Sequence, residues 1–218
     1  MKATLNTRLA LTAGALAGLA LNAPMALAAL PIRVQVVVHD DVAPPLRARL
    51  QEDYLQPWIQ EMESHFGRRV ELHFSHDVPG LSNLDYRTPD RRHTNVVIGR
   101  GNEAFWARQG DGRWNYRLDK TLLLVGGTYV PQDPSQPEVA GEATFKGGAG
   151  WATLKTYSAA GHELGHMFGA THENAQVLFN GWFCETYTYP SRANLRSNCY
   201  RYSDLNRKAI GAYLSEAP

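Results

Sequence analysis

The chain has 218 residues, 44% of them hydrophobic, and 22 lysines and arginines nearly balance 21 aspartates and glutamates. This length suits a single domain with an ordinary hydrophobic core, and we expect a monomer. Because no basic run is long enough to hold a nucleic acid or an anionic membrane surface, the charge pattern argues against both partners.

The N-terminus has the pattern of a secretory signal peptide. Lys2 and Arg8 give it a positive start, an apolar run follows, and Ala26-Leu27-Ala28 is a small-x-small cleavage site. The apolar run is shorter than the roughly 20 residues that a membrane span needs, which disfavours a retained anchor. We therefore expect residues 1–28 to be removed, leaving residues 29–218 as a secreted or periplasmic protein without a membrane anchor.

Runs of apolar and β-branched residues along this mature part are predicted strands. They lie at residues 33–38, 70–74, 95–98, 122–125 and 151–154. Apolar residues recur with a helical period over 46–66, and Pro57 should kink that helix. The pattern predicts one α/β domain with a small C-terminal lobe.

Residues 162–172 carry the clearest chemical pattern, His-Glu-Leu-Gly-His-Met-Phe-Gly-Ala-Thr-His. His162 and His166 are four residues apart on a predicted helix, so both imidazoles can reach one ion. A catalytic zinc takes three protein ligands, and the third must come from beyond the helix. Gly169 is suited to end the helix in a left-handed conformation, after which His172 can complete the set.

Glu163 follows the first of these ligands, where its carboxylate can take a proton from a water that zinc has activated. That arrangement predicts hydrolysis of a peptide bond, with the proton then passed to the departing amine. Two alternatives remain open. In one, Glu185 and not His172 is the third ligand; in the other, the protein binds metal but has lost catalysis.

Cys184 and Cys199 both lie in the predicted exported part. In an oxidising compartment such a pair predicts one disulfide, which contributes about 3 kcal/mol by constraining the unfolded chain. The alternative is a pair of thiolate metal ligands, although the three histidines form the better set.

The string at residues 162–172 is the signature of the metzincin clan of zinc metallopeptidases, which this protein resembles over most of its mature length. The resemblance implies a twisted, mostly parallel sheet with two long helices above a cleft, and an irregular C-terminal lobe ending in a helix. The upper lobe would cover about residues 29–169 and the lower lobe 170–218. Residues 121–125 would form the edge strand that pairs with an extended peptide substrate.

Within the clan, Gly141 and Ala143 resemble a Gly-x-Ala stretch of adamalysin and reprolysin-like domains, here closest to bacterial members. The tail is similar to theirs too, with a closing helix expected at 204–214. Glu173 after the third histidine instead resembles astacins. The resemblance implies a zinc-dependent endopeptidase acting on proteins or peptides, with a narrow-specificity processing enzyme or a catalytically weak metal-binding protein as the alternatives.

The methionine that gives the clan its name is missing, since no methionine follows His172. By position it would fall at Thr188 or Tyr189. In related families a tyrosine near this turn stabilises the transition state, so the resemblance makes Tyr189, and with it Tyr187, candidates for that role or for a substrate pocket. The alternative is that both tyrosines pack the lower lobe.

Overall fold

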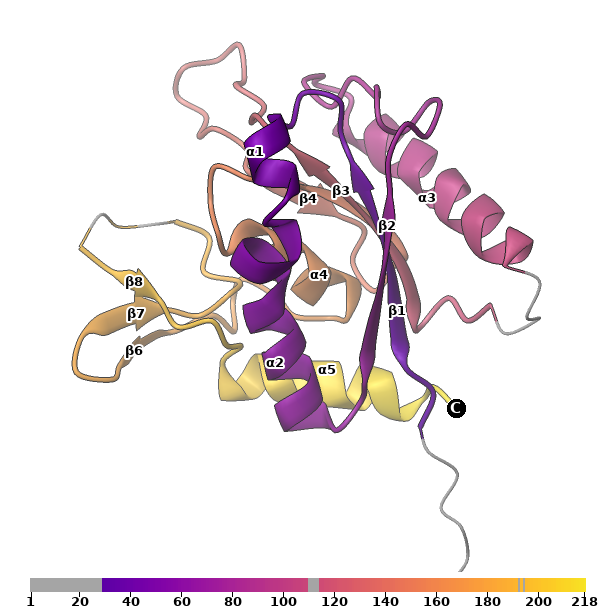
Figure 1. Ribbon diagram of the computed structural model, residues 1–218. Coiled ribbons are helices and arrows are strands. Elements are labelled where there is room, and N and C mark those ends of the chain that lie inside the picture. The colour runs from indigo at the N-terminus through magenta and orange to yellow at the C-terminus, as the bar shows by residue number, and fades with distance from the viewer. Residues whose placement is uncertain (1–28, 110–113, 192, 194) are drawn as a thin grey trace, which may run out of the picture.

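The structure is a computed structural model that describes residues 29–109, 114–191, 193 and 195–218; the predicted signal peptide lies outside the described residues. At its centre is a five-stranded sheet with the order β2-β1-β3-β5-β4 (Figure 1). Its strands are β1 (Ile32–Val38), β2 (Val70–Ser75), β3 (Asp119–Val125), β4 (Gly141–Ala143) and β5 (Ala149–Thr153). All pairings are parallel except that of β4 with β5. The predicted α/β class with a mostly parallel sheet is therefore confirmed.

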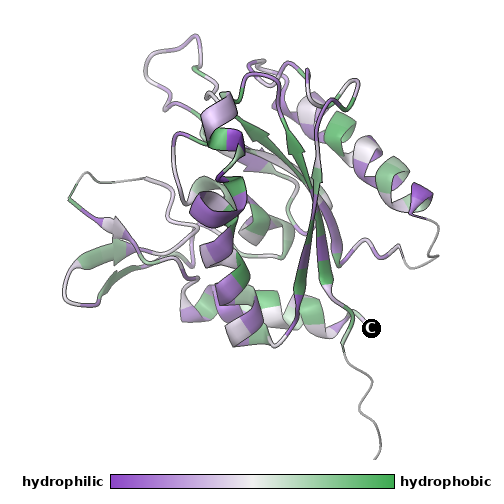
Figure 2. Ribbon diagram, viewed as in Figure 1, coloured by the Kyte–Doolittle hydropathy of each residue, from purple (hydrophilic) through white to green (hydrophobic). Residues whose placement is uncertain are grey.

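Helices cover both faces of this sheet (Figure 1). One face carries α3 (Arg91–Arg108), and the other carries α2 (Gln56–Phe66), α4 (Ala159–Met167) and α5 (Asp204–Ser215). Because both faces are covered, β1 and β3 are buried along their whole length, and Figure 2 shows them as mostly hydrophobic. Alternate residues of β1 thus pack into two separate cores.

The predicted helix at 46–66 is divided into three pieces. They are α1 (Pro44–Arg47), the π-helical turn η1 (Gln51–Leu55) and α2. Pro57 lies in the first turn of α2 and cannot donate a backbone hydrogen bond. The π-helical turn η1, which is wider than an α-helical turn, comes immediately before this first turn. The helix changes from π-helical to α-helical at Gln56, next to Pro57, the residue at which a kink was predicted.

The strand predicted at 95–98 is wrong, because these residues lie inside α3. Asp90 caps this helix by accepting a hydrogen bond from the His93 N–H at 3.0 Å. Thr94, Ile98, Asn102 and Trp106 are buried at four-residue spacing. A four-residue apolar run does not distinguish a strand from one turn of a buried helix, and here the cap and the longer period decide.

The edge strand was also predicted wrongly. Residues 121–125 belong to β3, which lies between β1 and β5 in the middle of the sheet. The strand beside α4 at the sheet edge is β4, only three residues long. Burial on both faces accounts for the continuous apolar run at 122–125 of β3, a property of central strands, whereas β4 is too short to show a period.

A smaller sheet forms most of the C-terminal lobe and projects from the rest of the molecule (Figure 1). Its strands are β6 (Val177–Phe179), β7 (Phe183–Glu185) and β8 (Ser197–Asn198). The expected disulfide joins Cys184 to Cys199 and ties β7 to the end of β8. The chain then closes with α5, as expected. In the described part of the chain, no helix has the length and apolarity needed to cross a lipid bilayer.

Candidate metal centre

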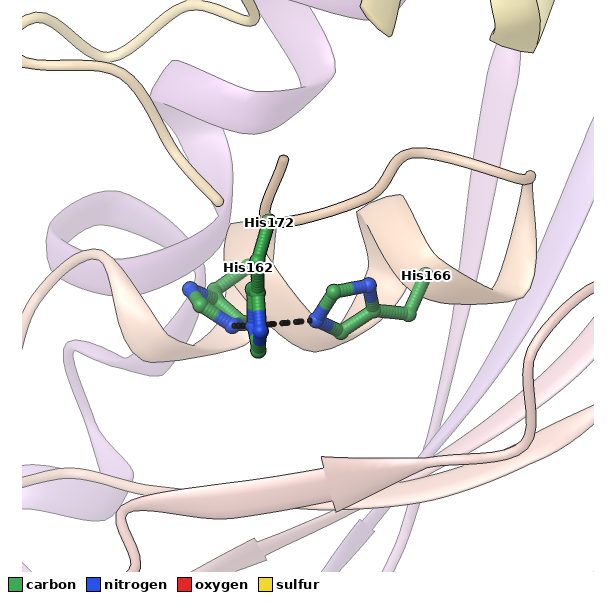
Figure 3. Close-up of side chains that lie close together, drawn as sticks. All are labelled: His162, His166 and His172. Carbon is green, nitrogen blue, oxygen red and sulfur yellow. Dashed lines mark hydrogen bonds between the residues drawn. The ribbon is translucent and has the colours of Figure 1, made fainter. Parts of the chain in front are cut away.

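Three imidazoles converge at the surface of α4 (Figure 3). His162 and His166 are one turn apart on this helix, and His172 returns from the loop that follows it. The Nε2 atom of His172 lies 2.9 Å from that of His162 and 3.0 Å from that of His166. The structure thus brings together the three residues that the spacing predicts as ligands.

The tight turn at Gly169 makes this return possible. Gly169 has a φ of +96°, and the N–H of Ala170 donates to the Gly165 carbonyl at 2.9 Å across the end of the helix. This is the Schellman arrangement, in which glycine is favoured at that position because it has no Cβ to clash in the left-handed conformation. The turn reverses the chain within three residues and directs His172 back to the helix face.

Backbone carbonyls orient the two helical histidines. His162 Nδ1 is 2.8 Å from the Tyr187 carbonyl oxygen, and His166 Nδ1 is 2.8 Å from that of Ala170. Because a carbonyl oxygen only accepts, each Nδ1 carries the proton and each Nε2 presents a lone pair. Burial and the two neighbouring histidines lower the pKa of His162 to about 3, so it is neutral at physiological pH.

The donor set fits Zn²⁺. Two nitrogens about 2.0–2.1 Å from a tetrahedral ion lie about 3.3 Å apart, a few tenths of an ångström more than the separations seen here. The other third-ligand candidate, Glu185, is outside the cluster. Its buried carboxylate accepts from the Ala193 N–H at 3.0 Å and faces Arg196 at 3.4 Å.

Glu163 lies next to the first ligand and is directed toward the sheet edge. Its side chain is buried, and a Cβ built on Gly141 of β4 would lie 2.6 Å from its Oε1 atom. The same Cβ would lie 2.7 Å from the Trp151 carbonyl oxygen, so glycine fits this position between the carboxylate and β5. Burial raises the pKa of Glu163 well above its usual value, and the nearby carboxylate of Glu142 raises it further.

The two candidate tyrosines have different surroundings. Tyr187 packs its ring beneath α4, and its buried hydroxyl has no hydrogen-bond partner among the described residues, which favours the packing alternative for this residue. Tyr189 is partly exposed and its hydroxyl lies 3.3 Å from an Arg196 guanidinium nitrogen. Sequence reasoning missed the ligand-orienting carbonyl of Tyr187, because a backbone acceptor leaves no mark on residue type.

An open pocket of about 350 Å³ adjoins the cluster. Its lining consists of Phe145, His166, Ala170, Thr171, His172 and Glu173. The hydrogen bonds that the Glu173 carboxylate accepts from its own N–H and from the Thr171 hydroxyl lower its pKa, so it is ionised at neutral pH. The pocket is wide enough for a side chain of a bound peptide, with Phe145 as its apolar wall.

Neither protein-family models nor curated proteins match this sequence. Among solved structures, metalloproteinase-II from Bacteroides fragilis matches with a TM-score of 0.56 and 13% identity, covering 85% of this chain and 53% of that one. Archaemetzincin from Methanopyrus kandleri matches with a TM-score of 0.50 and 14% identity, covering 85% and 96%.

These similarities show the class of fold, which is built on a mostly parallel sheet and is shared with both of these proteins. The chain spans about half the length of the Bacteroides protein and nearly all of the archaeal one. On that fold, the three histidines lie together as a candidate metal site.

Proposed function

We propose that this protein is a secreted zinc-dependent endopeptidase. The observation that carries the proposal is the convergence of the His162, His166 and His172 Nε2 atoms beside a buried glutamate, Glu163. Such an arrangement leaves one side of the ion open for water and substrate, as in catalytic zinc sites. The likeness of the fold to two metallopeptidases supports it.

When bound, zinc supplies the Lewis acidity that activates water and polarises the peptide carbonyl. Glu163 then acts as the general base. Its buried carboxylate lies beside the ligands, where it would take the proton of the water and return it to the departing amine. Gly141 leaves the space in which this carboxylate lies, and thereby couples the base to the edge strand.

The substrate would bind along β4. Within the described residues β4 pairs with β5 alone, so its outer edge has backbone groups free to pair with an extended peptide. A side chain of that peptide would enter the pocket beside His172. The Gly-x-Ala of β4 supports an adamalysin-like arrangement, combined with an astacin-like Glu173.

The experiment compares wild-type protein with Glu163→Gln in hydrolysis of a fluorescently labelled unfolded protein, with bound zinc measured in each sample. We expect Glu163→Gln to keep zinc and to lose at least about a hundredfold in rate, the usual contribution of a general base. The matched control is Glu103→Gln, which removes an exposed carboxylate of α3, on the opposite face of the sheet from α4, and should keep the wild-type rate. Equal rates for wild type and Glu163→Gln would refute the mechanism.

Export is a separate part of the proposal. The signal-like N-terminus motivates it, and the disulfide between Cys184 and Cys199 supports it, because such bonds persist in oxidising compartments. N-terminal sequencing of the protein recovered outside the cytoplasm tests whether the signal-like segment has been removed.

A further inference from the structure

The loop that carries His172 is hydrogen-bonded to Asn206, a buried residue in the first turn of α5. The Asn206 Oδ1 atom accepts a hydrogen bond from the Thr171 N–H at 2.9 Å. Its Nδ2 atom donates to the Thr171 carbonyl, also at 2.9 Å. One side-chain amide thus forms hydrogen bonds with both backbone polar groups of Thr171, the residue directly before the third ligand.

The same amide reaches a second segment of the site. Asn206 Nδ2 also donates to the Thr188 hydroxyl at 2.7 Å, and Thr188 is 0% exposed. Thr188 is one of the two positions at which the resemblance to metzincins would place the missing methionine. A hydrogen-bonded contact therefore occupies a place where an apolar packing residue was expected.

The two segments joined by Asn206 are those that orient the ligands. Thr171 follows Ala170, whose carbonyl holds His166, and precedes His172. Thr188 follows Tyr187, whose carbonyl holds His162. Asn206 therefore binds the residue next to each carbonyl that orients a helical histidine, and it also binds the residue directly before His172.

The start of α5 fixes Asn206 in turn. The Ser203 hydroxyl caps the helix by accepting from the Asn206 N–H at 3.2 Å, and it donates to the Asn174 carbonyl at 2.5 Å. The loop is thus held on both sides of His172, at Thr171 and at Asn174.

We propose that Asn206, together with Thr188, is a positioning clamp that presets the three histidines for the metal in place of a packed methionine. A methionine side chain fills space beneath a site but cannot hold two backbone segments by directed hydrogen bonds. Because the amide is buried, each of its hydrogen bonds is costly to break, which gives the clamp its rigidity.

The clamp rests on the proposed zinc site, so its test measures metal affinity and not peptide hydrolysis. The zinc dissociation constant is measured by competition with a chelator, and the visible spectrum of the Co²⁺-loaded protein reports ligand geometry. The thermal stability of each metal-free variant is recorded alongside. Asn206→Ala removes the clamp, whereas Thr188→Val removes one of its partners at nearly constant volume.

Asn102→Ala is the matched control. Asn102 is also a buried, hydrogen-bonded asparagine, which accepts from Trp106 Nε1 at 2.8 Å and from the Thr121 hydroxyl at 2.9 Å. It belongs to α3, on the opposite face of the sheet from α4. Its loss should lower stability without changing zinc affinity.

We expect Asn206→Ala to weaken zinc binding about 10- to 100-fold and to alter the Co²⁺ spectrum, as loss of ligand-supporting groups does. Thr188→Val should weaken it about two- to tenfold, the range of one hydrogen bond. Asn102→Ala should stay within about twofold of wild type.

Zinc affinities of Asn206→Ala and Thr188→Val equal to that of Asn102→Ala would overturn the clamp, even if all three variants lose stability. If Asn206→Ala does not fold, Thr188→Val decides alone, and an unchanged affinity and spectrum would overturn the proposal. A wild-type protein that binds no zinc would instead overturn the proposed function itself.

Discussion

Gly161 lies on the buried side of α4, directly before the first ligand, and the ring of Tyr187 packs against it. A Cβ built at this position would lie 2.3 Å from Tyr187 Cε1 and 2.6 Å from Cδ1. Ordinary carbon contacts begin near 3.5 Å, so Gly161→Ala requires the ring to retreat by about 1 Å. Tyr187 is buried, and the surrounding core has little room to take up that shift.

The magnitude follows from two opposing effects. Overpacking of this size costs about 1–3 kcal/mol, whereas replacing a helical glycine with alanine returns about 1 kcal/mol. Gly99→Ala on α3 isolates the second effect, because the nearest atom to a Cβ there is Ala149 Cβ at 3.7 Å. We expect Gly99→Ala to raise the free energy of unfolding by about 0.5–1 kcal/mol, and Gly161→Ala to lie about 1–3 kcal/mol below it.

The assay is urea-induced unfolding of the metal-free proteins, followed by zinc titration of the folded variants. Because the carbonyl of Tyr187 holds His162, displacement of that residue should also weaken zinc binding by about tenfold. If Gly161→Ala proved as stabilising as Gly99→Ala and bound zinc like wild type, the tight packing of Tyr187 beneath α4 would be refuted.

Two further predictions concern groups away from the histidines. Burial lowers the pKa of Lys120 from 10.5 to about 7, so between these values the unfolded chain binds the extra proton. The free energy of unfolding should therefore rise from pH 7 to pH 9, by at most about 1.4 kcal/mol per pH unit, and Lys120→Met should flatten this rise in urea unfolding; parallel curves would contradict it. N-terminal sequencing of the exported protein should begin at Ala29, and a first residue of Met1 would exclude cleavage.

The parts of the fold and site that could be predicted from the sequence are those determined by residues close together in the chain. The β-branched run of β1 and the apolar run of β3 are continuous because both strands are buried on two faces. The histidine spacing and Gly169 specify a helix, a turn and a return within eleven residues, so their arrangement follows from short-range geometry.

The rest depends on contacts between distant segments. Which strand forms the sheet edge is decided by the pairing of β4 with β5, and three residues are too few to carry a period. Asn206 lies 35 residues from Thr171, and nothing in the residue types of α5 indicates that its amide faces the ligand loop. A buried asparagine is recognised only when its partners are known.

The close contacts of Gly141 restrict which substitutions can accumulate at this position over evolution. A Cβ at 141 would lie 2.6 Å from the Glu163 carboxylate and also 2.7 Å from the Trp151 carbonyl oxygen. A descendant of this sequence could therefore acquire a side chain at 141 only if both the glutamate and the backbone of β5 moved. Loss of the glutamate alone would not release the position.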